Sequence, residues 1–453
     1  MSKLAGMDQY TGANYPYIDL TSYIHGQAIG GQALSYKPRS GGGKAGQVAA
    51  YLDSFIPQPY SDMEAVYNLL DYINYAGYGS GSLQPSMQQI SPERYDAFST
   101  LGVRANLLFG DALMQRSQAL RLGLAGGAGA SADALPESLG RLAQLAYVCS
   151  FSNPQMITPA MLPGQALQRG IGVWARGVGE FGTQVNSGDR TGFAYKTGGF
   201  VGGVDWQPRR DVILGIGAAY LGSGMDWSQN GGNANIKYAK FGLYGSYFTP
   251  RIFIDGVFSG GLNWAVAQRQ ITILSDDNVF FPSLYRTATS NQSGQDLAVH
   301  WRGGVNLSLG NWYLTPMAGL AYFYLHQNPF DEQGADSLNL NVKTNQAQTL
   351  RSTLGARLAR TSTAPSGAKI TPELTIGWAH NFTLDHRVIN ASLIELGGSF
   401  ATDGANADAD TLLAGAGITA QLANGVAFSG RYNAEIGRGF TSHMLNLGVR
   451  CEF

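Results

Sequence analysis

The stretch LNLGVRCEF, Leu445–Phe453, alternates at each step between an apolar residue and a polar or small one. Successive side chains of an extended strand point to opposite faces, so a period of two separates the two kinds of residue. The leucines, Val449, Cys451 and Phe453 share one face, while Asn446, Arg450 and Glu452 share the other. This stretch predicts a β-strand with one apolar and one polar face.

The same pattern recurs upstream over nearly 300 residues. In Val299–Leu309 and Leu350–Leu358, Leu, Val and Trp alternate with charged or small residues, and Val426–Ile436 repeats the scheme. We count about twelve such segments, which predict an antiparallel β-structure. They lie near residues 171–183, 191–207, 211–224, 233–249, 251–269, 294–310, 312–326, 339–362, 367–382, 409–422, 425–437 and 441–453.

Composition indicates what surrounds these strands. Charged residues make up 13% of the 453 residues and hydrophobic residues 44%, whereas soluble proteins carry about 25% charged residues. No apolar run approaches the roughly 18 residues of a membrane helix. A transmembrane β-barrel reconciles these facts, because its lipid-facing residues are every second residue of a strand. A soluble sandwich or propeller is the alternative. The net charge of −1 excludes the basic surface of a nucleic-acid-binding protein.

The connections between the predicted strands alternate in length. Tight turns are expected at Pro208–Arg210, Thr249-Pro250 and Gly310-Asn311, and long excursions at 270–293, 326–338 and 383–408. In bacterial outer-membrane barrels the short turns are periplasmic and the long loops extracellular. Within the strands, the polar face predicts charges that point into an aqueous lumen. These expected inward charges are Arg176, Asp205, Arg302, Arg351, Arg357, Arg431, Glu435 and Arg450.

The region before the strands has helical periodicity. Ser61–Glu64 has the pattern of a capping box. Ser91 can cap a helix whose first turn holds Pro92, and Tyr95, Phe98 and Leu101 begin an apolar face that runs to about Leu122. Such a helix would be roughly 45 Å long, enough to cross a barrel lengthwise. Residues 136–151 are an alternative lumen helix. We therefore divide the chain into an irregular lead or passenger remnant (1–43), a helical linker (44–169) and a β-barrel (170–453).

Several motifs resemble a known family in the order in which that family has them. They are Val173–Gly177 (VWARG), Gly198–Asp205 (GGFVGGVD), Leu350–Leu358 (LRSTLGARL), Pro372–His380 and, upstream, Ser91–Tyr95 (SPERY). The chain is thereby similar, over about residues 44–453, to the C-terminal translocator domain of autotransporters, the type V secretion proteins.

This resemblance implies a mainly β fold, a twelve-stranded barrel with an α-helix in its lumen, that places an N-terminal passenger segment on the cell surface. It also implies four further partners: outer-membrane lipid, lipopolysaccharide, the β-barrel insertion machinery and periplasmic chaperones. The terminal Phe453, with Leu445, Leu447 and Val449, would be the assembly signal that the insertion machinery reads. Two features depart from the family: about fifty residues separate Leu122 from Val173, and the Asn-Asn pair at which some members cleave themselves is absent.

Two other functions remain open. A stand-alone porin for small solutes would use the same barrel without a plug. A surface protease of the omptin type would need acidic pairs and a histidine on long loops, as in Asp276-Asp277 and Asp385-His386. The six histidines have no metal-ligand spacing, so we expect no enzyme, cofactor or metal site. Met1–Leu20 lacks the apolar core of a secretory signal, so we expect a mature product or the C-terminal part of a longer precursor.

Overall fold

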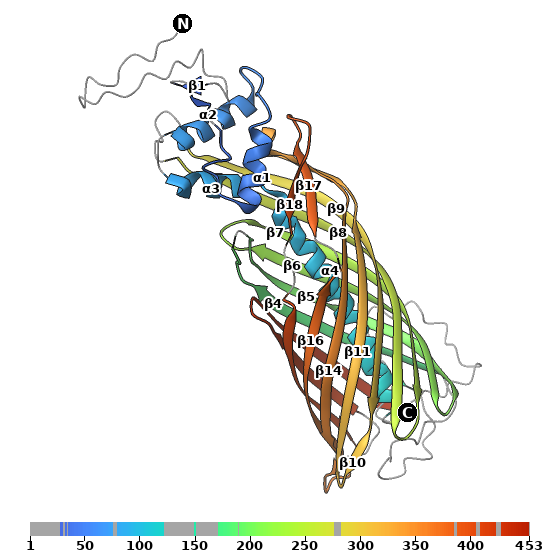
Figure 1. The fold of residues 1–453 in the computed structure, drawn as a ribbon. Coiled ribbons are helices and arrows are strands. Elements are labelled where there is room, and N and C mark those ends of the chain that lie inside the picture. Colours follow the sequence, from blue (N-terminus) through green and yellow to red (C-terminus); the bar gives the residue numbers. More distant parts are fainter. Residues whose placement is uncertain are drawn as a thin grey trace, which may run out of the picture.

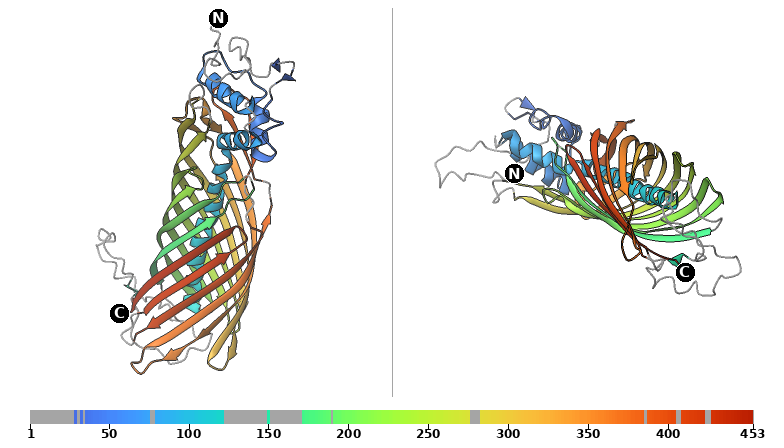
Figure 2. Two further views of the ribbon diagram at one scale, coloured as in Figure 1. Left: turned by 90° about the vertical axis from the view of Figure 1, so that its left-hand side faces the viewer. Right: turned by 90° about the horizontal axis from the view of Figure 1, so that it is seen from below.

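The computed structural model describes residues 28–29, 32–33, 35–75, 79–121, 149–150, 171–188, 190–275, 282–384, 387–404, 408–422 and 427–452. Within these residues, no helix is both long enough and apolar enough to cross a membrane. They form a β-barrel with a helix inside it and a group of three short helices at one end (Figures 1 and 2).

In the described part of the chain, twelve long strands build the barrel, each antiparallel to its neighbours. They are β4 (Ile171–Gln184), β5 (Phe193–Arg209), β6 (Val212–Trp227), β7 (Gly232–Phe248), β8 (Ile252–Ile273), β9 (Leu284–Val305), β11 (Trp312–Gln327), β14 (Asn345–Arg360), β16 (Lys369–Thr383), β19 (Asp410–Gln421), β20 (Ala427–Ile436) and β21 (Phe440–Glu452). Two short strands, β10 (Leu307–Leu309) and β15 (Ser362–Thr363), pair with β11 and β16 near short turns.

The barrel closes between its last and first strands. β21 pairs with β4 from Phe440 opposite Gln184 to Leu447 opposite Gly177. Beyond that point β21 pairs in parallel with β3 (Cys149–Ser150). The prediction of a twelve-stranded antiparallel barrel with an N-terminal helical segment is therefore confirmed. A closed barrel pairs every strand on both sides, which leaves no open sheet edge in the membrane.

The two faces of each strand meet different surroundings. Phe200, Ile216 and Trp301 point outward with exposed fractions of 70%, 58% and 56%, whereas Lys240 and Asp255 on alternate positions point inward and are buried. Large exposed apolar side chains occur on most of the twelve strands. This is the pattern expected of a barrel with lipid outside and polar groups inside.

Of the three expected long loops, one is mostly strand and the other two contain short regular elements. The hairpin of β8 and β9 stays paired as far as Ile273 opposite Leu284, so residues 270–293 are mostly strand and not an excursion. The segments 326–338 and 383–408 contain β12 (Phe330–Gln333), η3 (Asp336–Leu338), β17 (Val388–Leu393) and β18 (Phe400–Asp403). With β13 (Leu340–Val342), the strands β12, β17 and β18 form a small sheet beyond the barrel wall.

This small sheet supports the three short helices, which we call the cap: α1 (Gly43–Leu52), α2 (Asp62–Tyr75) and α3 (Gly79–Ile90). Tyr51 joins the two parts, because its hydroxyl donates to Gly397 O (2.5 Å) and accepts from Leu393 N (3.2 Å). The predicted capping box is half formed. Ser61 Oγ accepts from Glu64 N (3.1 Å), but the Glu64 carboxylate accepts from Tyr60 N (2.6 Å). The cap lies at the long-loop end of the barrel (Figure 1).

Candidate functional site: the helix seated in the barrel

A short 3-10 turn, η1 (Pro92–Asp96), leads from the cap into the long helix α4 (Ala97–Arg121). Ser91 caps this turn as predicted, because its Oγ accepts from Glu93 N (3.2 Å) and Pro92 follows it. The helical segment begins at Pro92 as predicted, but its first five residues are 3-10 helix and α4 itself begins at Ala97. Its 25 residues span about 37 Å. Figures 1 and 2 show α4 running inside the barrel from the cap toward the short turns.

Buried contacts hold the entrance of the helix at the long-loop end. Arg94 donates to Gln270 O (2.8 Å), and Asp96 pairs with Arg387 (3.1 Å). Tyr95 donates to Glu332, whose carboxylate also binds Arg269 (2.6 Å). Phe98 packs on Trp227, with ring centroids 6.2 Å apart. These contacts join η1 and the start of α4 to β6, β8, β12 and the loop before β17.

Deeper in the lumen, Arg104 lies at the place where the barrel closes. Its guanidinium binds Glu180 of β4 (2.6 Å), Glu435 of β20 (2.6 Å) and Ser442 of β21 (2.6 Å). The side chains of Arg104 and Glu180 are 7% and 0% exposed. Tyr195 donates to the same Glu180 carboxylate (2.6 Å). One residue of the helix therefore connects three strands, including both strands of the closing pair.

Two more arginines fix the lower part of α4. Arg116 makes a bidentate ion pair with Asp205 of β5 (2.6 and 3.1 Å). The same carboxylate accepts from Tyr244 (3.0 Å). Near the short turns, Arg121 pairs with Asp255 of β8, which also binds Arg302 of β9 (2.9 Å). A planar guanidinium suits such bidentate and shared carboxylate contacts.

Glycines allow α4 to approach the wall closely. A Cβ at Gly217 of β6 would lie 2.6 Å from Leu113 Cδ2, and one at Gly242 of β7 would lie 3.0 Å from Phe109 Cε1. On the helix itself, a Cβ at Gly110 would lie 2.7 Å from the ring of His300. Real Cβ atoms essentially never come within 3.0 Å of another atom, so a side chain at Gly217 or Gly110 would force Leu113 or His300 to move. At Gly242 the ring of Phe109 would have to give way slightly. Side chains of α4 thus fill depressions in the strands, and wall side chains fill depressions in α4.

Together these contacts make the position of α4 specific. Burying an ion pair carries a desolvation cost, so the pairs contribute little net stability, but removing one partner of such a pair costs about 3–5 kcal/mol. The ion pairs therefore favour one depth and rotation of the helix over others.

The structure places most of the sequence-predicted site residues in the lumen. Asp205, Arg302 and Glu435 bind α4 directly, as does Arg176, which donates to Gln115 Oε1 (2.5 Å). Arg351 pairs with Glu435 (2.8 Å), and Arg357 (3.0 Å) and Arg431 pair with Glu373. Leu445 and Leu447 point outward and are exposed. The side chains of Val449 and Arg450, and Phe453, lie outside the described residues, as does most of the alternative helix 136–151.

Sequence reasoning missed Arg104, Arg116 and Arg121. Each interrupts a mostly apolar helix, and an arginine there is a signal that carboxylates lie nearby. The sequence does not show which carboxylates these arginines bind, because partners such as Arg104 and Glu435 are 331 residues apart in it.

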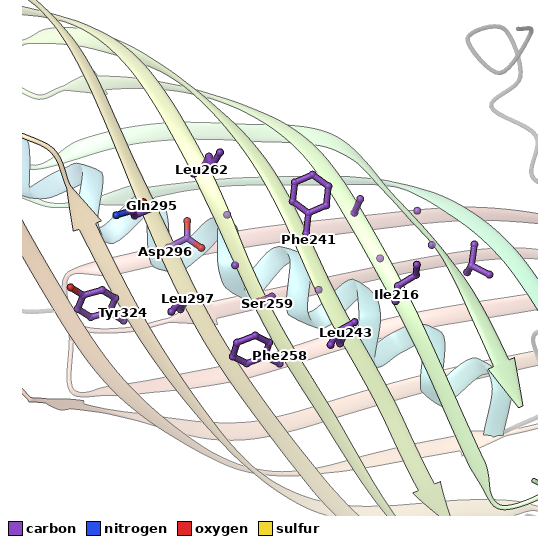
Figure 3. Close-up of a pocket in the computed structure, with 18 residues that line it drawn as sticks. Ile216, Phe241, Leu243, Phe258, Ser259, Leu262, Gln295, Asp296, Leu297 and Tyr324 are labelled. Atoms are coloured by element: carbon purple, nitrogen blue, oxygen red, sulfur yellow. The ribbon is translucent and has the colours of Figure 1, made fainter. Parts of the chain in front are cut away.

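A depression of about 830 Å³ lies on the outer wall over β5–β9 and is drawn in Figure 3. Phe241, Leu243 and Phe258 border it and are themselves exposed. Small residues such as Gly202, Ala218 and Gly260 form part of its floor. Its lining is almost entirely apolar and faces away from α4, so it belongs to the lipid-facing surface and is not a route into the lumen.

The described residues hold no group of three His, Cys, Asp or Glu side chains that could bind a metal ion. The pairs Asp276-Asp277 and Asp385-His386, considered above for a protease, lie outside the described residues.

Two curated outer-membrane proteins are similar to this chain in sequence. Outer membrane protein B of Rickettsia prowazekii (strain Madrid E) is 25% identical over 56% of this chain and 15% of its own length. Outer membrane protein A of Rickettsia conorii (strain ATCC VR-613 / Malish 7) is 23% identical over 62% of this chain and 14% of its own length. The chain thus spans about one seventh of each of these relatives.

Solved structures with a similar arrangement include the translocator domain of the autotransporter NalP from Neisseria meningitidis. It is 20% identical, with a TM-score of 0.48, over 62% of this chain and 87% of that one. The β-domain of the Bordetella autotransporter BrkA is 17% identical, with a TM-score of 0.44, over 61% of this chain and 98% of that one.

The family described as the autotransporter beta-domain matches residues 173–433, from the first barrel strand into β20. This match covers more than half of the chain and the strands that surround α4, and the protein therefore belongs to the autotransporter β-domain family.

Proposed function

We propose that this chain is an outer-membrane translocator whose barrel holds α4 as a plug and presents the residues before α4 at the cell surface. The family places the barrel in the outer membrane. Short turns are periplasmic in such barrels, so the opposite end, where the cap lies, faces outward. The passenger, its activity, and the contacts with outer-membrane lipid, lipopolysaccharide, the insertion machinery and periplasmic chaperones are part of this proposal.

The observation that carries the proposal is the direction of α4. Asp96 pairs with Arg387 beyond the long-loop end of β16, whereas Arg121 pairs with Asp255, close to the short turn between β7 and β8. Between Asp96 and Arg121 the chain thus crosses the lumen from the cap to the short turns. Crossing in this direction leaves the cap on the outer side, as presentation of an N-terminal passenger requires.

Buried ion pairs of Arg104, Arg116 and Arg121 also favour a plug over an open porin. A porin lumen is a water-filled channel, whereas the upper and middle parts of this lumen contain the buried side chains Leu101, Leu108 and Leu113.

Surface labelling of intact cells tests the proposal. An epitope tag placed before Ser35 in the full chain is expected to be removed by protease added to intact cells, while the barrel stays intact. A second tag in the short turn at Arg210-Asp211 is the matched control and should be removed only after the cells are permeabilised. A tag before Ser35 that protease reaches only in permeabilised cells would overturn the proposal.

A further inference from the structure

Helix α4 does not lie on the axis of the barrel. It packs against β4–β9 and β11, where Leu101, Ala105, Leu108 and Ala112 are buried. The adjacent stripe at positions 100, 103, 107 and 111 is only partly buried. These positions recur at three- and four-residue steps, so they share one face of the helix. Val103 and Leu107 of this stripe also pack against the buried cluster of Phe323 and Leu325, so the stripe is partly covered by the wall and partly accessible to solvent.

The wall opposite this face is also accessible. It consists of β14, β16, β19 and β20, whose inward positions are mostly glycine or small polar residues. The partly exposed inward residues of this wall are Thr353, Gly355, Thr375, Gly377, Gly415, Gly417, Ser429 and Asn433. Small side chains facing a partly exposed helix face leave a strip of the lumen accessible to water; we call it the lumen strip.

Charges beside the lumen strip are unevenly paired. Glu373 is shared by Arg357 and Arg431, and Asp255 is shared by Arg121 and Arg302. Each carboxylate thus neutralises only one of two guanidinium groups. Arg176 adds another positive charge, because its side-chain acceptor is the neutral amide oxygen of Gln115 (2.5 Å).

One acidic residue opposes this excess. Asp111 lies on the partly exposed stripe of α4, and its carboxylate has no ion-pair partner among the described residues. Its single negative charge does not balance the arginines beside the strip. The potential of a low-dielectric channel with this charge excess attracts anions and repels cations.

We propose that the lumen strip conducts small inorganic anions past the seated helix in preference to cations, and that Asp111 limits this preference. The inference rests on the proposed seat of α4 but not on which side of the membrane the cap faces. It assigns a second activity to the plugged barrel. Chloride suffices as a probe, because recognition here depends on charge and not on shape.

The test is the reversal potential of the full-length protein in a planar lipid bilayer under a KCl gradient. Wild type is expected to conduct weakly, with a permeability to Cl⁻ several-fold that to K⁺. Arg176→Gln and Arg431→Gln should each lower this ratio, and Asp111→Asn should raise it. Lys237→Gln, which removes an exposed charge on an outward position of β7, is the matched control and should leave the ratio unchanged.

Three results would overturn the inference: no measurable conductance, equal or cation-favouring permeability, or the same ratio in Asp111→Asn and Arg176→Gln as in wild type. Folding of each variant is checked by its faster migration in unheated gels. Arg176→Gln keeps the test valid if Arg431→Gln fails to fold, because Arg176 binds no carboxylate. The surface-labelling experiment is independent of these outcomes, so either idea can fail alone.

Discussion

Arg104 of the lumen helix lies 2.6 Å from Glu180 of the first barrel strand, and the same guanidinium binds Glu435 and Ser442 of the last two strands. The helix therefore holds together the seam at which the barrel closes. Backbone pairing at the seam is shorter than at the neighbouring pair: it has eight paired positions, Phe440–Leu447 against Gly177–Gln184, whereas β4 and β5 pair over more. Arg104 adds a side-chain connection at this place.

Replacing Arg104 should weaken the seam. Arg104→Met leaves Glu180 and Glu435 buried without this partner, and losing one side of a buried ion pair costs about 3–5 kcal/mol. We expect the heating temperature at which the barrel unfolds in gels to fall markedly. Arg209→Met, at a guanidinium that is 72% exposed, is the control and should change little. The double variant Arg104→Met/Glu180→Gln should recover part of the lost unfolding temperature. Equal unfolding temperatures in wild type and Arg104→Met would contradict the role of Arg104 at the seam.

The glycine contacts predict a difference between two positions of one strand. Gly217→Val places atoms where Leu113 lies, whereas Gly222→Val, on the same strand, meets open space because no heavy atom lies within 4 Å of its Cβ position. Overpacking costs about 1–3 kcal/mol. We expect Gly217→Val to lower the unfolding temperature and to raise bilayer conductance as α4 shifts. If both variants behave alike, the close fit of Leu113 against β6 does not hold the helix in place.

The contact of Asp62 with Arg286, which helps to dock the cap, should depend on pH only in strong acid. Hydrogen bonds from Arg286 (2.6 Å) lower the pKa of Asp62 from 3.8 to about 2. A lowered folded-state pKa means that the contact stabilises the cap above pH 3.8 and that this contribution is lost as the pH falls through about 2. Hydrogen exchange of α2 amides, corrected for intrinsic rates, should therefore accelerate between these values. Asp62→Asn should remove this step, and an unchanged step in that variant would assign it to another group.

The lipid-facing side of the last strand should tolerate no charge. Leu447 is 58% exposed on the outer face of β21, so it faces lipid acyl chains, where a charged side chain costs up to about 2–4 kcal/mol. We expect Leu447→Asp to reduce the amount of folded barrel in outer-membrane fractions several-fold. Arg438→Asp, at an exposed position before β21, should assemble normally. Equal amounts of the two variants would show that Leu447 does not face lipid.

The barrel was predictable because lipid outside and water inside impose a period of two on every strand, as in Leu445–Leu447 around Asn446. The small sheet and the cap were not. Leu340 and Leu393 are fully buried in one cluster with cap residues such as Tyr51, which come from a distant part of the chain. A local pattern carries no information about such a partner. The position of α4 against the wall could not be predicted for the same reason, since Leu113 and Gly217 meet only after the barrel closes.

Covalent capture of α4 in its seat tests the central claim most directly. Cysteines at Leu113 and Gly217, with Cys149 and Cys451 replaced by serine, are bridged in membranes by a short bis-methanethiosulfonate, which forms a reducible disulfide with each thiol and releases sulfinate. The chain is then cut at a protease site inserted between residues 130 and 140. The account predicts that the N-terminal fragment stays joined to the barrel on non-reducing gels and separates after reduction, while a cysteine at Gly222 in place of Gly217 captures nothing. Release of the fragment without reduction, or equal capture by both cysteines, would contradict a helix seated against β6 inside the barrel.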